Sequence, residues 1–270
     1  MLSRKKSRII YTSLLIFFIV VFWAIENFYT PGIDSNLEDI ADKTEVPLVL
    51  RPTSTTSDII EHRHYVLSYN EDYEQAEWVA YILKKGHLTS QERERPYFIE
   101  DPKVRTKSAD WKNYKNSGYD RGHLCPAGDR RFSEFAYDET FYTSNITPMN
   151  NDFNAGVWNR LELQIRYWGK KYDSVFVVTG GILNEGLNSI GEEDVAIPDV
   201  FYKIVAKGPI DNMDVAAFLI PHEESHKPLR TFMVPVDRIE QLTGIDFFKE
   251  MPDSIENRLE AEVNVRKWKF

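Results

Sequence analysis

Short runs of β-branched and aromatic residues recur along the chain, and turn-forming or charged residues bound each of them. They cover residues 65–69, 78–83, 175–179, 201–206 and 215–220. Runs of this length and composition are typical of β-strands. The pattern therefore predicts one domain built around a sheet.

A helical pattern separates the second and third of these runs, over residues 154–168. Its apolar residues recur at i, i+4, i+8 and i+11 and comprise Val157, Leu161, Ile165 and Trp168. That spacing predicts a helix with one buried stripe. Asn154, Glu162 and Arg166 fall on its polar side, as expected for a helix that forms the floor of a site.

A second helix is predicted near the C-terminus. Ile255, Leu259 and Val263 follow one another at intervals of four residues, which places them on one face of a helix. We expect this helix to pack on the sheet.

Residues 9–25 form a run of seventeen residues without a charge. About 17 to 25 apolar residues are enough to cross a bilayer as a helix, so the run predicts a membrane anchor over residues 1–29. A cleaved signal peptide is the alternative, but no small-x-small cleavage motif follows Ile25. Basic residues precede the run and acidic residues follow it, which predicts a single-pass anchor with the domain outside the cytoplasm.

Two further segments follow the anchor in the predicted organisation. Residues 30–57 are rich in Pro, Ser, Thr and Asp and show no sustained periodicity, so they predict a flexible linker, and residues 58–270 form the folded domain. We expect a bacterial envelope rather than a mitochondrial compartment, because no extended Arg- and Ser-rich presequence is present.

Composition narrows the class of protein. The chain has 270 residues, 42% of them hydrophobic and 28% charged, as in ordinary globular proteins. A single cysteine, Cys125, excludes an intramolecular disulfide and a cysteine-rich zinc site. The net charge of −9 argues against a globally basic coat protein for nucleic acid. Residues 101–131 are nevertheless locally basic, with eight Lys or Arg against four Asp.

Candidate chemistry concentrates between Gly118 and Glu162. Asp-Arg-Gly-His at 120–123, Ser-Asn-Ile-Thr-Pro at 144–148, Asn154 and Trp-Asn-Arg-Leu-Glu at 158–162 follow one another in order. Together they closely resemble the DNA/RNA non-specific endonucleases, the group of Serratia nuclease and mitochondrial endonuclease G. The likeness extends more loosely over most of residues 65–247. Met149 departs from the family pattern, which usually has Gln at that position.

The resemblance implies an α+β fold of the ββα-metal (His-Me finger) type, with a central, mainly antiparallel sheet flanked by helices. It implies one hydrated divalent ion, usually Mg²⁺, which Asn154 holds and which Mn²⁺ could replace. A neutral amide oxygen suits such a hard, hydrated cation. By the same matching, His123 is the general base, a role that suits imidazole because its ordinary pKa is about 6.5.

The remaining site residues also follow from the resemblance. Arg121 and Arg166 match positions that contact the phosphate, and Arg95 could match an arginine beside the substrate. Asn145 matches a position that supports the site, and Glu162 a carboxylate in the outer shell of the metal. Along a straight helix Asn154 and Glu162 are about 12 Å apart, so direct coordination by both is implausible. The expected activity is metal-dependent hydrolysis of DNA and RNA recognised through the phosphate backbone, and the sequence leaves open whether the chain dimerises.

Other interpretations compete with this one. Taken alone, Asp-Arg-Gly-His occurs by chance, and Glu162 and Arg166 could form an ion pair on an exposed helix face. A membrane-tethered protein that binds nucleic acid without cleaving it is a further alternative. Cys125 is expected to be a small buried residue, whereas His62, His64 and His87 are expected to be solvated.

A zinc protease is the other enzymatic alternative. His222-Glu223-Glu224-Ser225-His226 satisfies the His-Glu-x-x-His pattern. Pro221 and Pro228 bracket the segment and leave too little room for the long helix that such a site needs. A surface turn is therefore the expected structure.

Overall fold

The computed structural model describes residues 11–21 and 44–270, which belong to two units, Met1–Ala41 and Asp42–Phe270. Residues 11–21 of the first unit are helical and largely exposed. Among the described residues, no helix combines the length and apolar character needed to cross a bilayer. The rest of the predicted anchor and residues 30–43 of the predicted linker lie outside the described residues.

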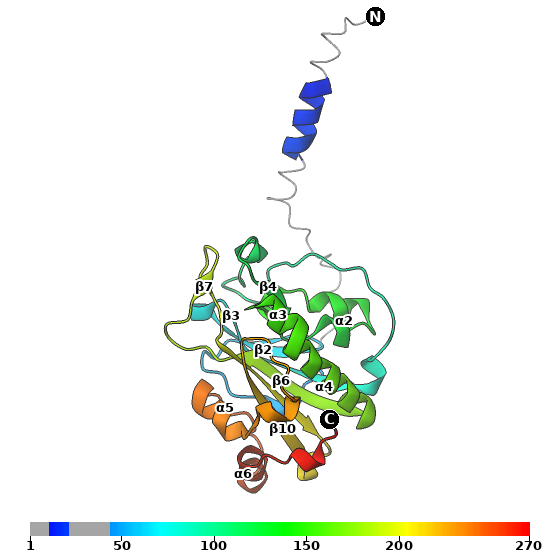
Figure 1. Ribbon diagram of the computed structural model, residues 1–270, viewed down its shortest axis with the longest axis vertical. Helices are drawn as coiled ribbons and strands as arrows, with labels where there is room; N and C mark the ends of the chain where they lie inside the picture. Colours follow the sequence, from blue (N-terminus) through cyan, green and yellow to red (C-terminus); the bar gives the residue numbers. More distant parts are fainter. Residues whose placement is uncertain (1–10, 22–43) are drawn as a thin grey trace, which may run out of the picture. The chain divides into compact units, whose positions relative to one another are not determined.

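A seven-stranded sheet organises the second unit (Figure 1). Its strand order is β1-β2-β3-β6-β9-β10-β11, and all neighbouring pairs are antiparallel. The strands are β1 (Ile59–Glu61), β2 (Val66–Asn70), β3 (Gln75–Lys84), β6 (Ser174–Gly181), β9 (Val200–Lys207), β10 (Asp214–Pro221) and β11 (Met233–Val234). The predicted α+β class is confirmed, and each of the five predicted strand regions lies in this sheet.

Two small sheets and several helices complete the unit. The small sheets pair β4 (Asp120–His123) with β5 (Ile146–Met149), and β7 (Ser189–Ile190) with β8 (Val195–Ala196). The α-helices are α2 (Glu134–Glu139), α3 (Asn151–Phe153), α4 (Asn159–Lys171), α5 (Val236–Thr243) and α6 (Asp253–Ala261). Short 3₁₀ helices span Leu48–Leu50, Glu71–Tyr73, Lys85–His87, Trp111–Tyr114, Ala127–Asp129, Thr143–Asn145, Ile210–Asn212, Leu229–Phe232 and Val265–Lys267.

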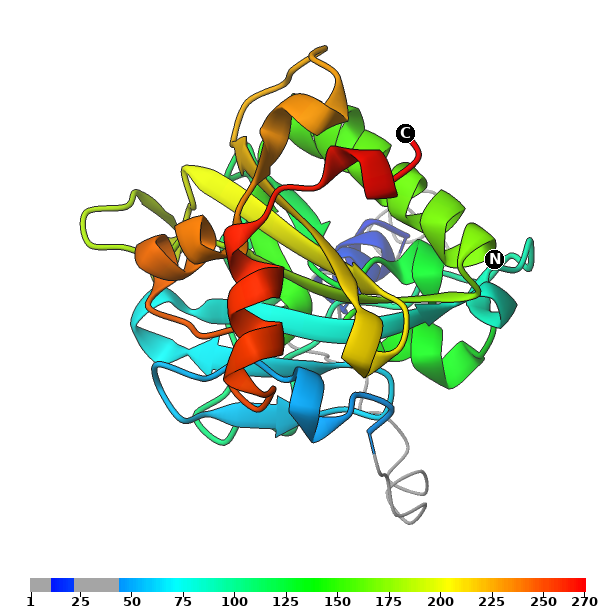
Figure 2. The same cartoon turned by 90° about the horizontal axis from the view of Figure 1, so that it is seen from below.

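The sheet is covered on both faces, because alternate residues of each strand point to opposite sides. On one face, Val79 and Tyr81 of β3 belong to an apolar core that includes Leu161 and Ile165 of α4. On the other face, Trp78 and Ala80 share a second core with residues of α5 and α6. Figure 2 shows α5 and α6 in front of the strands and α4 behind them. The active-site elements described below join the first face.

The helix predicted over 154–168 is present, and its four stripe residues are buried, as predicted. It is not one regular α-helix. A π-helical turn, Asn154–Trp158, joins α3 to α4, and Gly156 inside it has non-helical angles of φ −93° and ψ −109°. Leu161, Ile165 and Trp168 all lie in α4 after this turn, so their helical spacing is unaffected by it. Such π-helical turns are common sites of a kink.

The C-terminal helix is confirmed as α6, with Leu259 buried in the second core and Ile255 packed against it. The prediction was wrong for Val263, which is 41% exposed. The helix ends at Ala261, so Val263 leaves the helical face on which the spacing placed it.

The folded packing begins before the predicted boundary at residue 58. Val46 and Leu50 are buried in the second core. The backbone amide of Thr53 donates to the carbonyl oxygen of Asp246, and the Thr53 hydroxyl accepts from the backbone amide of Asp246. The segment before residue 58 thus packs on the domain through the buried side chains of Val46 and Leu50.

The expectation that three histidines are solvated was wrong. His62 and His64 are buried and lie 2.7 and 2.6 Å from carboxylate oxygens of Asp101 and Glu139, and His87 is buried against Phe132. Both carboxylates come from segments distant in sequence, so the pairing could not be read from the local pattern.

Candidate active site

The site is built where β4 pairs with β5 and the chain then enters α3. In this antiparallel pair Arg121 lies opposite Pro148, and His123 opposite Ile146. Gly122 has no room for a side chain, because a Cβ atom there would overlap Met149. Met149, where the family usually has Gln, is fully buried and packs over the strand that carries Arg121 and His123.

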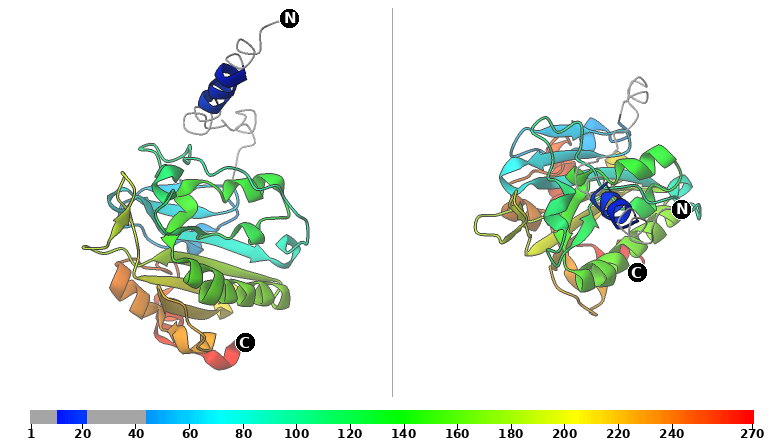
Figure 3. Two further views of the ribbon diagram at one scale, coloured as in Figure 1. Left: turned by 45° about the horizontal axis from the view of Figure 1, so that its top comes forward. Right: turned by 90° about the horizontal axis from the view of Figure 1, so that it is seen from above.

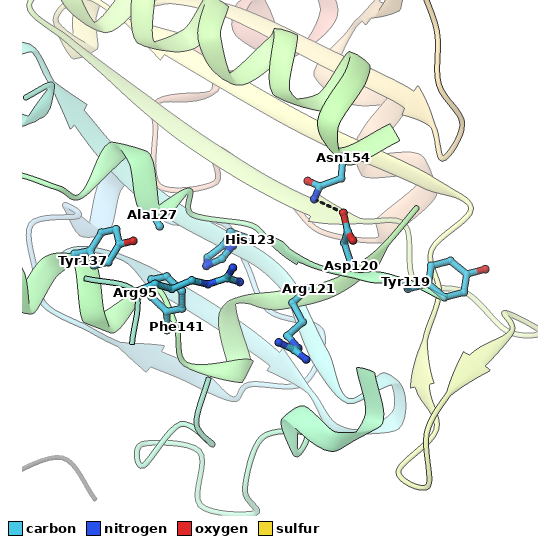
Figure 4. Close-up of a pocket in the computed structure, with 9 residues that line it drawn as sticks. All are labelled: Arg95, Tyr119, Asp120, Arg121, His123, Ala127, Tyr137, Phe141 and Asn154. Atoms are coloured by element: carbon cyan, nitrogen blue, oxygen red, sulfur yellow. Dashed lines mark hydrogen bonds between the residues drawn. The ribbon is translucent and has the colours of Figure 1, made fainter. Parts of the chain in front are cut away.

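Four of the predicted site residues line one pocket of about 560 Å³. They are Arg95, Arg121, His123 and Asn154, and Figure 4 shows them around one opening. The other lining residues are Tyr119, Asp120, Ala127, Tyr137 and Phe141. Residues separated by up to 59 positions thus meet in one concave site.

Asn154 is oriented by a neighbouring carboxylate. Its Nδ2 donates to Oδ2 of Asp120 at 3.0 Å (Figure 4). Nδ2 of Asn151 donates to the same oxygen at 3.1 Å. With its nitrogen held in this way, the Asn154 amide leaves its carbonyl oxygen free to face the pocket. Amide and carboxylate oxygens are the donors that hard divalent cations prefer, so the residues present fit such an ion.

His123 lies between two phenyl rings. Its ring centroid is 5.0 Å from that of Phe141 and 5.6 Å from that of Phe98, and its Nε2 is buried without a hydrogen-bond partner. Burial, aided by the positive charge of Arg95, lowers the pKa of His123 to about 3. The imidazole is therefore neutral at pH 7, with a lone pair available to accept a proton.

Two guanidinium groups flank the histidine. Arg95 and Arg121 both lie over the Phe98 ring, at 5.2 and 5.0 Å from its centroid. Within the described part of the chain neither forms an ion pair, and Nε of Arg121 is buried without a partner. Burial and the charge of Arg95 lower the pKa of Arg121. Two unpaired cations beside one another favour an anion in the pocket.

The chain resembles known nucleases over most of its length. The family model of the DNA/RNA non-specific endonucleases matches residues 46–254. The chain belongs to this family. It is 36% identical to the mitochondrial nuclease EXOG of Danio rerio over 69% of this chain and 60% of that protein. It is 33% identical to the mitochondrial nuclease of Saccharomyces cerevisiae, over 77% of this chain and 70% of that protein.

A solved structure has the same fold. One chain of the crystal structure of the EndoG/EndoGI complex superposes with a TM-score of 0.67 at 30% identity, covering 72% of this chain and 87% of that one. The recognition of the family and its mainly antiparallel α+β architecture are thereby confirmed. The chain spans about 60% of the length of the EXOG relative.

Glu162 and Arg166 lie beside the pocket of this family member but do not line it. Arg166 Nε donates to Oδ1 of Asp129 at 2.5 Å, and its Nη2 donates to Oε2 of Glu162 at 3.2 Å. The ion pair between positions 162 and 166 is present, but it is largely buried and not on an exposed face. Burial raises the pKa of Glu162, and the charges of Lys203 and Arg166 oppose that shift.

Asn145 is fully buried, and its side chain links the segment before β5 to the segment that follows β4. Its Nδ2 donates to the carbonyl oxygens of Cys125 and Thr140 at 3.0 and 2.9 Å, and its Oδ1 accepts from the amide of Cys125 at 2.8 Å. These bonds hold the segment that follows His123. Cys125 itself is buried, as predicted, and burial raises the pKa of its thiol to about 12.

Two basic residues, Lys203 and Arg130, are buried in the structure although nothing in the sequence indicated it. Lys203 of β9 is fully buried, 4.3 Å from the Trp158 ring centroid, and burial lowers its pKa to about 8. Because Lys203 lies within a β-favouring run, the sequence did not single it out as a residue near the site. Arg130 belongs to the basic stretch of residues 101–131, but it is fully buried and donates to the carbonyl oxygens of His64 and Ile82. Its charge therefore lies inside the domain and not on the basic surface that residues 101–131 could present to substrate.

The His-Glu-x-x-His segment forms a turn and not a helix, as predicted, and it braces the helix that carries Asn154. Nε2 of His222 accepts from the backbone amide of Asn150 at 2.7 Å. Oε2 of Glu224 accepts from the backbone amide of Val157 at 2.8 Å, which the turn at Gly156 frees. The side chain of His226 is 96% exposed. Among the described residues neither histidine belongs to a group of three side chains close enough to share an ion, and the family match is to nucleases, so the zinc-protease alternative was wrong.

Replacing Gly156 by alanine is expected to disturb this brace. The new Cβ would overlap the carboxylate of Glu224 and displace it from the Val157 amide. An unpaired buried amide costs about 1–3 kcal/mol, and we expect the free energy of unfolding in urea to fall by that amount. Activity should fall about tenfold, because Asn154 lies two residues away.

Gly86→Ala is the matched control, since nothing lies within 4 Å of the Cβ it would add. The double variant Gly156→Ala/Glu224→Ala removes the overlap and should be no less stable than Glu224→Ala alone. Wild-type stability of Gly156→Ala would contradict the role of the brace.

Proposed function

We propose that this chain is a metal-dependent endonuclease that hydrolyses phosphodiester bonds of DNA and RNA without sequence preference. The observation that carries the proposal is the single pocket in which a neutral histidine, an oriented amide oxygen and two unpaired arginines meet. General base, metal ligand and phosphate clamp are the parts that metal-assisted phosphodiester hydrolysis requires. The relatives named above are nucleases, in agreement with this assignment.

In the proposed mechanism Arg95 and Arg121 bind the scissile phosphate and offset the charge that gathers on it. Asn154, oriented by Asp120, would hold the divalent ion. When bound, Mg²⁺ or Mn²⁺ supplies a Lewis acid at the phosphate oxygens. The imidazole of His123 accepts a proton from the attacking water, whose oxygen forms the new bond to phosphorus while the bond to the leaving 3′ oxygen breaks, and solvent protonates that oxygen. The bound phosphate offsets the positive charge of Arg95, so it raises the pKa of His123 toward a range useful for proton transfer.

The remaining assigned residues support this arrangement. Asn145 fixes the backbone after His123. Glu162 acts from the outer shell of the divalent ion. Arg166 orders Glu162 and Asp129 through its hydrogen bonds in the absence of substrate, and it contacts the phosphate if substrate binding draws it there. Contacts made through charge to phosphates carry no base information, which accounts for activity on both DNA and RNA.

The test is cleavage of supercoiled plasmid and single-stranded RNA by the full chain in mild detergent, with Mg²⁺ and with EDTA. Both substrates should be degraded only when metal is present. Binding of well-folded protein to both substrates without any cleavage would instead support the non-catalytic alternative and refute the proposal.

We also propose that residues 1–29 anchor the enzyme in a membrane with the nuclease domain outside the cytoplasm. The uncharged run over residues 9–25 and the basic residues before it support this placement. The relatives are named as mitochondrial, so an organelle compartment competes with the bacterial envelope. Release of the full chain from membranes by alkaline carbonate would refute the anchor.

A further inference from the structure

Five carboxylates meet around Glu260 at the junction of α5 and α6, on the sheet face opposite the active-site elements. Oxygens of Glu260, Asp237 and Glu240 lie within 4.8 Å of one another, and Glu260 forms a second such group with Asp246 and Glu256. Asp237 and Glu240 belong to α5, Glu256 and Glu260 to α6, and Asp246 to the connection between them. Figure 3 shows α5 and α6 grouped away from α2.

This cluster contains charge that the protein does not compensate. Within residues 44–270, none of the five carboxylates forms an ion pair with a basic side chain. Glu240 receives a hydrogen bond at its Oε1 from the backbone amide of Phe247, at 2.9 Å, and the carboxyl groups of Glu240 and Glu260 hydrogen-bond to each other, which leaves Oε1 of Glu260 unpaired. Like charges one turn apart on a helix, as at positions 256 and 260, destabilise it. The arrangement therefore needs a positively charged partner.

Glu260 provides the independent observation. It is only 7% exposed, and its Oε1 is enclosed without a hydrogen-bond partner, as is Oδ1 of Asp246. The Glu260 side chain points into the cluster, since it is the one residue that belongs to both groups of described carboxylates. A buried carboxylate without a partner is costly and is normally paired or bound to a metal.

A proton alone compensates only part of this charge. Burial, and then the charges of Glu240, Glu256 and Asp246, raise the pKa of Glu260 to about 8. Protonation would neutralise Glu260 but leave the other four carboxylates facing one another. A divalent cation between the helices would attract all of them at once.

We infer that the carboxylates of Glu260 and its four neighbours bind a calcium ion that links α5 to α6. Calcium takes six to eight oxygen ligands in flexible geometry, whereas magnesium demands a stricter octahedron and keeps more water. Zinc is disfavoured because the cluster contains no histidine or cysteine. The inference does not depend on the proposed nuclease activity.

The expected consequence is stabilisation of the helix pair. Val236 and Ile239 of α5 and Leu259 of α6 pack into the same core under the sheet. A cation that holds the two helices together therefore holds the cover of that face in place. It binds the native chain and not the unfolded one, so it raises the unfolding temperature.

The experiment is thermal unfolding of the full chain, stripped with EDTA and then titrated with Ca²⁺ or Mg²⁺ in the absence of nucleic acid. Saturating Ca²⁺ should raise Tm by about 5 °C, and Mg²⁺ by less. Glu260→Gln should abolish the shift. Glu250→Gln, which removes an exposed carboxylate near α6 outside the cluster, should keep it.

Asn154→Ala separates this site from the proposed catalytic ion, because it should keep the Ca²⁺ shift. Loss of the shift in Asn154→Ala with retention in Glu260→Gln would overturn the inference. An unchanged wild-type Tm with Ca²⁺ between pH 6 and 8 would also overturn it and assign the compensation to protons. If Glu260→Gln does not fold, the half-buried Glu256→Gln supplies the same comparison, and an undiminished shift there counts against the site.

Discussion

Replacement of His123 by alanine is expected to lower kcat for plasmid and RNA cleavage by about 10²- to 10⁴-fold, the usual contribution of a general base. The imidazole lines the pocket beside two unpaired arginines and is neutral, so its loss removes the proton acceptor while the phosphate-binding groups remain. Binding of a labelled oligonucleotide in EDTA should change little. His226→Ala is the control, because that side chain is 96% exposed and lies outside the pocket.

The pH profile of the wild-type enzyme checks the same role. The pKa of His123 is lowered by burial and by Arg95 to about 3, so the neutral, active form persists as the pH falls below the ordinary histidine value. We expect kcat/KM to decline on acidification only well below pH 6.5. Equal loss of binding and activity in His123→Ala would contradict a catalytic role and indicate a structural one.

Replacement of Asn154 by alanine is expected to lower activity at least about 100-fold, because metal-assisted charge stabilisation contributes several kcal/mol. The variant loses the amide oxygen that faces the pocket and leaves Asp120 without its hydrogen bond at 3.0 Å. Steady-state cleavage measured across a range of Mg²⁺ concentrations is the appropriate measurement. Raised Mg²⁺ should recover part of the activity of Asn154→Ala and none of that of His123→Ala.

Asn159→Ala is the matched control for this prediction. It removes the same amide from the same helical segment, at an exposed position outside the pocket. Near-wild-type cleavage by Asn154→Ala with an unchanged Mg²⁺ dependence would show that the ion is held elsewhere.

Much of the fold was predictable because its signals are local. Strands such as β9 and β10 are continuous β-favouring runs, and the stripe of α4 follows helical periodicity. Val263 shows where such reasoning fails. The four-residue spacing of apolar residues continues to Val263, but the helix ends at Ala261. The family motifs predicted Arg121, His123 and Asn154 of the pocket because each motif lies within a few positions of the chain, and Arg95 was matched separately.

The supporting half of the site was not predictable, because long-range contacts create it. Asp120 orients Asn154 from 34 positions away, and Glu224 braces Val157 from 67 positions away. The His-Glu-x-x-His pattern is also that of a zinc site, but Glu224, one of its variable positions, accepts a hydrogen bond from the backbone amide of Val157. The burial of His62 and His64 was not predictable either, because their partners Asp101 and Glu139 are distant in sequence.

The sequence by itself determined the class of this protein, the five main strands of its large sheet, two of its helices, its family and the residues to which the proposed chemistry is assigned. Each of these depends on spacing along the chain. Only the tertiary structure decided the low pKa of His123 and the turn at Gly156. It also decided that Arg166 pairs with Asp129 outside the pocket lining and that carboxylates gather around Glu260. Burial and electrostatic coupling depend on which side chains meet in space, and that is a property of the packed molecule.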